Sequence, residues 1–382
     1  MIKIITTILV VLVCCLITSN GGGIVLARKP TQTPSPTPTP PPSQVILPSN
    51  ANLFYQGRVD QSNSSVYSFD WSGVAIGFAF KGTTNVRALF STSLTTEDNM
   101  FNVFINYGLY STLNISSTSN EAYNLISGGT LDPQQTYILI LTKRTEAAIG
   151  IINFYGLVVD QSAILFPINP FNDNPNKRIE FIGDSITCGY GIDGTPPCSF
   201  TAETENNYQT YAGVVSRILG ADLHVESWSG KGVVRNYDAN GTTSVDPFPT
   251  YYGRTIANNP NSTWTFQDWV PQAVVINLGT NDFSSQPYPP QTVFEQGYTN
   301  FIDSIRTKYN NGTVFFLACG PMISDPCCQY VQNVATATKS IYIDLQDILD
   351  SSDLGCNGHP NVNGHLKMAM NSLPIIQKNL GW

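Results

Sequence analysis

Charged residues are scarce in this chain of 382 residues, at 12% of the sequence, and histidine occurs only three times. Acidic residues outnumber basic ones by 27 to 19, which gives a formal charge of −8. The chain therefore lacks the positive surface that nucleic-acid phosphates attract. It also lacks a C-x-x-C pair and an H-E-x-x-H motif, which disfavours a zinc site. With 42% apolar residues, the composition excludes a chain that is disordered throughout.

An almost unbroken apolar run occupies Ile4–Thr18. It is shorter than the about 20 residues that a membrane-spanning helix needs. Lys3 precedes the run and the small residues of 19–27 follow it, a pattern typical of an export signal. We expect residues 1–27 to be a cleaved signal peptide, the mature protein to be secreted to the extracellular space, and no stable membrane span to remain. A retained anchor is the alternative.

Six of the eight cysteines lie outside this segment. In an oxidising compartment an even number of cysteines predicts disulfides, with a metal site as the alternative. Cys188 and Cys198 bracket a short loop, and we expect them to pair. Five triplets fit the N-glycosylation pattern, which has meaning for a secreted glycoprotein. These begin at Asn63, Asn114, Asn240, Asn261 and Asn311.

Residues 28–48 form a tract rich in proline, threonine and serine, which favours an extended linker. In residues 49–170 apolar residues then alternate with a period of two, as in Val74, Ile76, Phe78 and Phe80. This pattern, broken by turn residues, predicts an all-β antiparallel sandwich. The expected strands cover residues 74–80, 86–91, 101–107, 137–142 and 151–159.

The stretch NDNPNK at residues 172–177 is the expected hinge to a second domain, residues 175–382. Strand and helix patterns alternate there, and an apolar stripe of Phe294, Tyr298, Phe301 and Ile305 predicts one helix. Another helix is expected over residues 208–219. Such alternation predicts a three-layer α/β domain with a parallel sheet and active groups at the carboxyl ends of the strands. The expected strands cover residues 178–182, 224–227, 273–278, 314–318 and 341–345.

Four short motifs follow these strands or precede the C-terminal helix. The first strand runs into G-D-S-I-T, which places Ser185 on a tight turn with an exposed hydroxyl. The next two strands lead to S-W-S-G-K-G and G-T-N-D, which contain Gly230 and Asn281. With the main-chain N–H of Ser185, these two residues provide three donors for an oxyanion hole. His359, followed by proline near the C-terminus, is the expected general base.

These motifs in this order resemble the SGNH, or GDSL-type, hydrolase superfamily. The longer blocks RIEFIGDSITCGYG, SWSGKGVVRNY, VVINLGTNDFS and HPNVNGHLKMA resemble carbohydrate esterase family 2 more closely. The resemblance covers everything after the linker, and it implies a flavodoxin-like SGNH domain preceded by a jelly-roll sandwich.

The same resemblance implies a secreted deacetylase whose substrate is an acetylated polysaccharide of the xylan or glucomannan type. Ser185 would attack the acetyl carbonyl to form an acyl-enzyme, and His359 would carry the proton. No metal or organic cofactor is implied, because the nucleophile and its base supply the chemistry.

One position departs from the superfamily pattern. Members commonly carry aspartate three residues before the histidine, where this chain has Cys356, or two residues before it, where this chain has Asn357. Asp353 is the nearest acidic residue upstream and is the candidate orienting acid. The resemblance to members that use a dyad implies instead that a main-chain carbonyl orients the ring. We therefore expect a Ser185–His359 dyad.

Trp228 and Arg235 lie in the second block and are candidate substrate-binding residues. A tryptophan ring can stack on a sugar, but it can equally pack between sheet and helix. Arg235 can shape the same pocket or form an ion pair elsewhere.

The other polar residues near the motifs are expected to be structural. His224 lies on a predicted strand, and His365 lies at the start of the last helix. Asp184 and Asp282 are expected to brace their turns through side-chain to main-chain hydrogen bonds.

Two alternative functions stay open at this stage. The superfamily motifs alone also fit a GDSL lipase or thioesterase that acts on longer acyl groups. The sandwich, the linker and the missing acid fit a non-catalytic carbohydrate-binding matrix protein.

Overall fold

The computed structural model describes residues 42–93, 96–127, 129, 131–170, 177–309 and 312–382. The expected signal peptide, most of the linker and almost all of the hinge lie outside these residues, as does Asn311. The other four acceptor asparagines of the glycosylation triplets are exposed. Among the helices that are described, none has the length and apolarity needed to cross a membrane.

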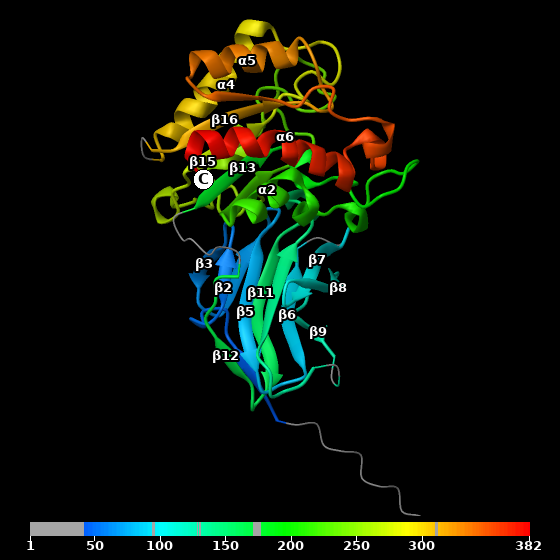
Figure 1. Cartoon of the computed structure of the whole chain (residues 1–382), viewed down its shortest axis with the longest axis vertical. Coiled ribbons are helices and arrows are strands. Elements are labelled where there is room, and N and C mark those ends of the chain that lie inside the picture. The colour runs from blue at the N-terminus through cyan, green and yellow to red at the C-terminus, as the bar shows by residue number, and fades with distance from the viewer. Residues whose placement is uncertain (1–41, 94–95, 128, 130, 171–176, 310–311) are drawn as a thin grey trace, which may run out of the picture. The chain divides into compact units, whose positions relative to one another are not determined.

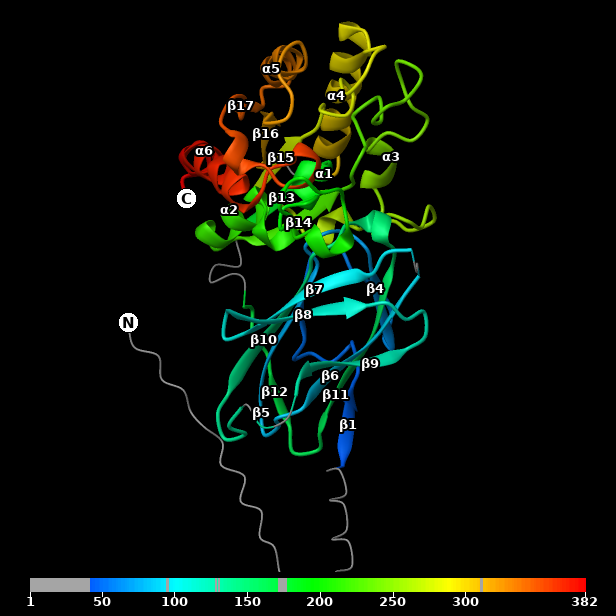
Figure 2. The same cartoon turned by 90° about the vertical axis from the view of Figure 1, so that its right-hand side faces the viewer.

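The N-terminal domain is a sandwich of two antiparallel sheets, as the sequence predicts (Figures 1 and 2). The first sheet has the order β3-β4-β11-β6-β9, with β1 also paired to β11. The second has the order β12-β5-β10-β7-β8, with β2 also paired to β5. The first sheet consists of β1 (Ser43–Ile46), β3 (Asp60–Asn63), β4 (Val66–Phe69), β6 (Val86–Thr92), β9 (Glu121–Ile126) and β11 (Ile152–Asp160). The second consists of β2 (Phe54–Gln56), β5 (Ala75–Lys81), β7 (Asn99–Ile105), β8 (Gly108–Ile115), β10 (Tyr137–Lys143) and β12 (Ile164–Phe166).

Aromatic side chains fill the space between the two sheets. Phe90 of β6 stacks on Phe101 of β7 with ring centroids 5.5 Å apart, and lies 5.1 Å from Phe154 of β11. All three side chains are fully buried. Because the described part of this domain contains no cysteine, sheet-on-sheet packing of this kind holds it together.

The sandwich begins earlier than the sequence indicates. Residues 43–46 were assigned to the linker, but they form β1, which pairs with Leu157–Asp160 of β11. Gly156 makes this pairing possible, since a Cβ there would lie 2.1 Å from the carbonyl oxygen of Ile46. The linker assignment is therefore wrong for these four residues.

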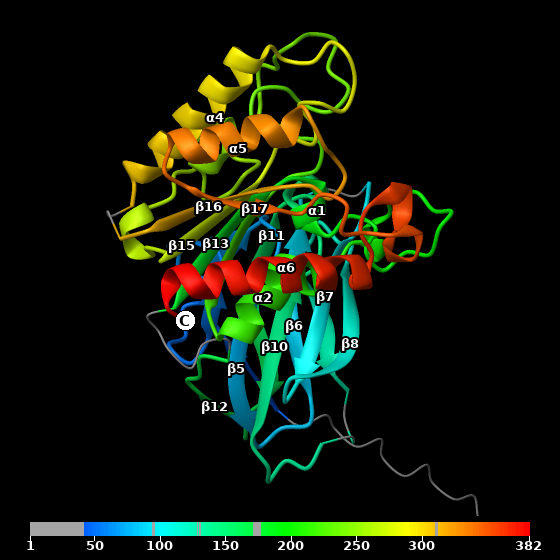
Figure 3. The same ribbon diagram turned by 45° about the horizontal axis from the view of Figure 1, so that its top comes forward.

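The C-terminal domain has five parallel strands in the order β14-β13-β15-β16-β17, the expected flavodoxin-like arrangement. Helices α2 and α6 pack together on one face of the sheet, and α4 and α5 on the other, so the three-layer prediction is confirmed (Figures 1 and 3). The strands are β13 (Arg178–Gly183), β14 (Asp222–Ser227), β15 (Ala273–Asn277), β16 (Val314–Cys319) and β17 (Ile341–Asp344). The α-helices are α1 (Ser185–Cys188), α2 (Tyr211–Leu219), α3 (Pro249–Tyr252), α4 (Gln291–Arg306), α5 (Cys327–Ala337) and α6 (Val362–Leu380). Short 3-10 helices cover Ala147–Ile149, Ala202–Thr204, Asn207–Gln209, Phe266–Asp268, Ser351–Asp353 and Cys356–Gly358.

Both helices expected from sequence are present. The stripe that predicted the second helix is buried on α4, together with Ile302. The first expected helix is divided, because Asn207–Gln209 forms a 3-10 turn and α2 begins at Tyr211. The Thr210 side chain caps α2 by accepting a hydrogen bond from the Gly213 N–H.

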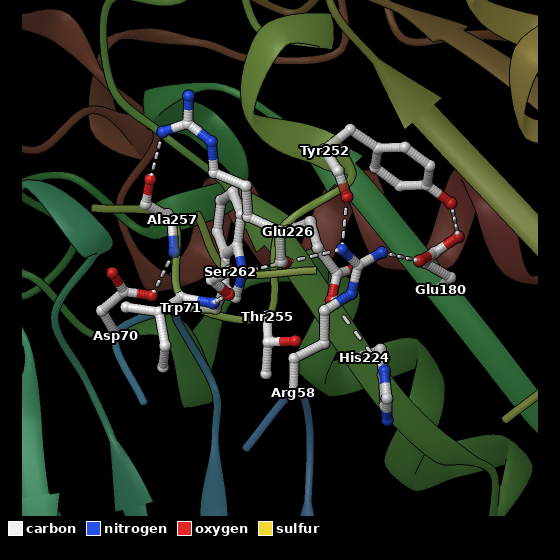
Figure 4. Close-up of polar contacts among 12 residues, drawn as sticks. Arg58, Asp70, Trp71, Glu180, His224, Glu226, Tyr252, Thr255, Ala257 and Ser262 are labelled. Atoms are coloured by element: carbon white, nitrogen blue, oxygen red, sulfur yellow. Dashed lines mark hydrogen bonds and ion pairs between the residues drawn. The ribbon is translucent and has the colours of Figure 1, made fainter. Parts of the chain in front are cut away.

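A buried arginine of the sandwich joins the two domains (Figure 4). The Arg58 guanidinium lies 2.9 Å from Glu180 of β13 and 2.9 Å from Glu226 of β14. It also donates to the main-chain carbonyl of Tyr252, whose hydroxyl binds Glu180 at 2.9 Å. The side chains of Arg58, Glu180 and Glu226 are completely buried, so each charge depends on the others for its solvation.

The disulfides differ from the expected pairing. Cys198 bonds to Cys356 and Cys319 bonds to Cys328, while Cys188 and Cys327 are free and buried. The predicted Cys188–Cys198 bond is wrong, because the Cys188 thiol lies in a buried polar cluster, 3.7 Å from a carboxylate oxygen of Glu146.

Candidate active site

The nucleophile turn joins β13 to α1. Asp184 caps the short helix, since its carboxylate accepts a hydrogen bond from the Ile186 N–H at 3.1 Å. Gly183 must lack a side chain, because a Cβ there would lie 2.0 Å from the Thr187 hydroxyl. This tight turn presents Ser185 at the carboxyl end of β13, on the wall of a pocket of about 640 Å³.

His359 reaches Ser185 across 174 positions of sequence. Its Nε2 atom lies 2.8 Å from the Ser185 Oγ, within hydrogen-bond distance. Burial lowers the pKa of His359 to about 4, although the nearby main-chain groups of Cys356 and Asn357 oppose this shift. The imidazole is therefore neutral near pH 7 and can accept the serine proton.

In the part of the chain that the structure describes, no acidic side chain is bonded to the other ring nitrogen of His359. Within the described residues, His359 Nδ1 has no hydrogen bond of acceptable geometry, and the Cys356 and Asn357 main-chain groups are the ones that favour its protonated form. The Asp353 carboxylate instead accepts the Asp350 N–H at 2.8 Å and the Lys367 ammonium at 2.5 Å. The assignment of Asp353 as the orienting acid is therefore wrong, since its carboxylate braces the start of α6.

Aromatic packing fixes the plane of the histidine ring. Tyr190 stacks on His359 with ring centroids 4.1 Å apart. The Phe200 ring packs on Tyr190 with ring centroids 4.6 Å apart. The Asn357 side-chain amide donates a hydrogen bond to the Tyr190 hydroxyl at 2.8 Å. Tyr190 was not singled out from the sequence, although it lies in the first motif block.

The three expected oxyanion donors surround the same pocket. Ser185 is the first residue of α1, so its main-chain N–H has no partner within the helix. Gly230 has a φ of +79°, which a glycine adopts without strain. The Asn281 side chain is oriented by bonds from its Nδ2 to the Lys231 carbonyl at 2.9 Å and to Asp184 at 3.1 Å. To bind an oxyanion, this amide must share one of these hydrogens.

Asp184 and Asp282 brace the loops, as expected. Asp282 accepts three main-chain N–H groups of the second loop, at 2.8, 2.8 and 2.9 Å. Burial raises the pKa of Asp184 to about 7 and that of Asp282 to about 6, while main-chain hydrogen bonds oppose both shifts. These carboxylates fix the relative positions of the nucleophile turn, the Gly230 loop and the Asn281 loop.

The two candidate substrate-binding residues lie away from the pocket wall. Arg235 is fully buried and donates to the main-chain carbonyls of Gly241 and Ala239, so its assignment to substrate binding is wrong. Trp228 is partly buried and packs on Tyr251 with centroids 4.7 Å apart. The pocket wall instead carries Tyr190, Tyr237, Phe283, Met322 and Ile323 beside the polar residues already described. Tyr237 lines the pocket and is 66% exposed.

The remaining histidines are structural, as expected. His224 stacks on Trp269 at 3.6 Å, and burial lowers its pKa well below the usual value. His365 accepts the Tyr211 N–H at the start of α2. Neither residue lines the pocket.

One group of potential metal ligands includes Cys188, the last residue of α1. Oxygen or sulfur atoms of Glu146, Cys188 and Glu205 lie within 4.8 Å of one another. Burial raises the pKa of both Glu146 and Glu205, while the positive charge of buried Lys143 opposes the two shifts. We assign no metal to this group.

Comparisons with known proteins agree with this geometry. Residues 181–367 match the GDSL-like Lipase/Acylhydrolase family, and residues 55–168 match the Carbohydrate esterase 2 N-terminal family. The chain is 32% identical to Cellulase/esterase CelE of Acetivibrio thermocellus over 89% of its length, but spans only 41% of that protein. It is 26% identical to an acetylxylan esterase / glucomannan deacetylase of Cellvibrio japonicus, covering 82% of this chain and 86% of the relative.

A solved structure extends the match to both domains. The structure of a family two carbohydrate esterase from Clostridium thermocellum in complex with cellohexaose is 31% identical to this chain, with a TM-score of 0.77. The alignment covers 86% of this chain and 99% of that one. The chain therefore belongs to carbohydrate esterase family 2.

Proposed function

We propose that this protein is a secreted serine esterase that removes O-acetyl groups from polysaccharides of the xylan or glucomannan type. The observation that carries the proposal is the 2.8 Å contact between His359 Nε2 and Ser185 Oγ, on a pocket that Gly230 and Asn281 also line. A nucleophile, a neutral base and oxyanion donors on one pocket are the parts that acyl transfer requires.

The reaction follows from this arrangement. Ser185 Oγ attacks the acetyl carbonyl while His359 Nε2 takes the hydroxyl proton. The carbonyl oxygen gains a negative charge, which the N–H groups of Ser185 and Gly230 and the Asn281 amide stabilise. The intermediate then expels the sugar oxygen, which receives the proton from His359, and leaves an acetyl group on Ser185. Water, deprotonated by His359, releases acetate and restores the hydroxyl.

The size and lining of the pocket support a sugar substrate. A pocket of about 640 Å³ is far larger than an acetyl group requires, and the exposed Tyr237 ring provides a face on which a sugar can stack. The relatives point the same way, since one is an acetylxylan esterase / glucomannan deacetylase and another was solved in complex with cellohexaose. Phe283, Met322 and Ile323 give the pocket an apolar side, which is the feature that favours longer acyl groups as the second candidate.

Secretion is part of the proposal. The described residues contain two disulfides and four glycosylation triplets whose asparagines are exposed, features that suit an oxidising compartment outside the cytosol. N-terminal sequencing of the protein recovered from culture medium tests it, with a start close to residue 28 as the expected result. A full-length chain that stays with the cells would contradict it.

The function is tested by measuring acetate released from acetylated xylan and glucomannan by the wild-type protein and by a folded Ser185→Ala variant. We expect release that Ser185→Ala abolishes. A series of p-nitrophenyl esters from acetate to octanoate measures acyl preference, and a maximum at octanoate would favour the lipase or thioesterase alternative. Equal, negligible hydrolysis of every ester by both proteins, with retained polysaccharide binding, would favour a non-catalytic carbohydrate-binding protein.

A further inference from the structure

The segment that follows β10 of the sandwich reaches the oxyanion loop of the other domain. Glu146, 2% exposed, stands between β10 and the 3-10 helix at Ala147–Ile149. Its carboxylate accepts a hydrogen bond from the main-chain N–H of Ser229 at 2.7 Å. Ser229 directly precedes Gly230, whose N–H is one of the three expected oxyanion donors.

The other main-chain bonds of this loop come from within its own domain. The Trp228 N–H donates to the Gly183 carbonyl at 3.2 Å, and the Lys231 N–H to the Trp228 carbonyl at 3.3 Å. The Gly230 carbonyl accepts the Tyr237 N–H at 2.8 Å. Within the described part of the chain, the Gly230 N–H has no protein acceptor, so it is free for a ligand. The contact with Glu146 thus fixes the peptide unit next to a free donor.

Glu146 also contacts the helix that begins with the nucleophile. The Cys188 thiol, at the end of α1, lies 3.7 Å from the same carboxylate oxygen. The Glu146 N–H donates to Glu205 at 3.0 Å, which fixes the main chain of Glu146. Burial raises the pKa of Glu146, while the Ser229 hydrogen bonds and the Lys143 charge oppose the shift. The Lys143 ammonium is bound to the carbonyls of Thr145 and Glu146, so the positive charge is held in place.

We propose that Glu146 is a positioning residue through which the sandwich domain fixes the oxyanion hole of the esterase domain. The inference rests on the proposed function. Oxyanion donors act only when they are held close to the position of the developing charge, within about 0.5 Å. Without Glu146 the partly buried Ser229 N–H would lose its acceptor, so the loop would rearrange to find another one and would turn the Gly230 N–H away.

The first test compares kcat and KM of variants on p-nitrophenyl acetate, which has no sugar to bind. Removal of an oxyanion donor lowers kcat by about 100-fold or more. In Glu146→Ala one donor is misplaced rather than removed, so we expect kcat to fall by about 30-fold and KM to change by less than about threefold. Glu146→Gln keeps an oxygen acceptor for Ser229 and should recover to within about fivefold of wild type. Glu146→Asp keeps the charge, but its shorter side chain moves the carboxylate away from Ser229, so kcat should fall in this variant as well. It replaces the alanine variant in the test if that variant does not fold.

Glu97→Ala is the matched control. The carboxylate of Glu97, in the sandwich, also accepts a hydrogen bond from a main-chain N–H of the other domain, that of Ala202, at 3.2 Å. It does not touch the oxyanion loop, so its loss should leave kcat within about twofold of wild type.

A second readout separates positioning from a general loss of structure. Methylboronic acid forms a tetrahedral adduct with an active serine and places an oxygen in the oxyanion hole. Its affinity should fall in Glu146→Ala by about the factor lost from kcat/KM, because both depend on transition-state binding. Wild-type kcat and boronate affinity in folded Glu146→Ala or Glu146→Asp would overturn the inference, as would an equal loss in Glu97→Ala. If Ser185→Ala hydrolysed p-nitrophenyl acetate as well as wild type, the proposed function itself would be wrong.

Discussion

Cys356, which stands three residues before His359, is joined by a disulfide to Cys198. Many related hydrolases carry the acid of their triad at this position, so the bond occupies the place of a carboxylate. It ties the turn that carries His359 to the loop that carries Phe200 and Tyr190. The Tyr190 ring packs against the imidazole, and the Phe200 ring packs against Tyr190. We infer that aromatic packing and the Cys198–Cys356 disulfide orient His359, which is the task of the charged partner in a triad.

Replacing Tyr190 tests this role for packing. Tyr190→Leu removes the ring that stacks on His359 at 4.1 Å, and we expect kcat on p-nitrophenyl acetate to fall about tenfold with the fold retained. Tyr190→Phe keeps the ring and loses only the bond from Asn357, so it should stay within about twofold of wild type. Equal kcat values for the leucine variant and wild type would show that the stack does not position the base.

Removing the Cys198–Cys356 disulfide should affect both stability and catalysis. In the double variant Cys198→Ser, Cys356→Ser we expect the free energy of unfolding to fall by about 2 to 5 kcal/mol, measured by urea denaturation, and kcat to fall as the His359 turn loosens. The other disulfide, Cys319–Cys328, spans a sequence separation of 9 rather than 158. Its removal is the control and should lower stability with kcat preserved. A wild-type kcat in the Cys198→Ser, Cys356→Ser variant would show that this disulfide does not position His359.

Much of the architecture could be predicted from the sequence because it depends on local patterns. Alternation of strands and helices gave the parallel sheet, and the motifs at strand ends placed Ser185, Gly230 and Asn281 on one pocket with His359. What could not be predicted depends on contacts between distant segments. Strand β1 is recognisable only by its pairing with β11.

The errors have the same cause. Cys188 and Cys198 are close in sequence, yet their side chains enter different environments, and no local signal distinguishes Cys356 as the partner. Arg235 is a candidate for substrate binding because it lies in the second motif block, and nothing in the sequence marks this arginine as buried. The structure shows its guanidinium saturated by carbonyl groups such as those of Gly241 and Ala239. Glu146 could not be found at all, since it lies in the other domain.

Substitution of the base and of Asp353 distinguishes a dyad from a triad. We expect His359→Ala to lower kcat by about 10⁴-fold or more, as loss of a base does in serine hydrolases. Asp353→Asn should change kcat by less than about threefold, because the carboxylate contacts Asp350 and Lys367 rather than the imidazole. The two variants are compared on p-nitrophenyl acetate after circular dichroism confirms their fold. Comparable losses would restore Asp353 as the third member of a triad.

The pH dependence of kcat/KM should reveal the buried histidine. Burial lowers the pKa of His359 to about 4. Below that pH the ring is protonated and cannot take the serine proton, so the rate should fall as pH falls through about 4 and stay level between about 5 and 7. The profile is measured with p-nitrophenyl acetate at pH values where the protein stays folded. An acid limb centred near the ordinary histidine value would mean that the imidazole is solvated in solution.

The buried Arg58 between Glu180 and Glu226 predicts a large and pH-dependent loss of stability on substitution. Arg58→Met leaves two fully buried carboxylates without their cation, at a cost of about 3 to 5 kcal/mol in the free energy of unfolding. Burial already raises the pKa of Glu226 well above its usual value, and Arg58 opposes that shift. Without Arg58 the folded-state pKa rises further, so the folded protein binds more protons than the unfolded chain. The loss in the free energy of unfolding should therefore be largest at pH 7 to 8 and shrink as pH falls toward 5.

The companion variant Arg58→Met, Glu226→Gln removes one of the two charges and should recover about half of the loss at pH 7. Urea denaturation of both variants at several pH values measures this. A loss below about 1 kcal/mol in Arg58→Met, or one that does not change with pH, would mean that water enters the junction and solvates the carboxylates. In that case the two domains would be held by their apolar contacts, and Arg58 would contribute to the specificity of their docking rather than to its strength.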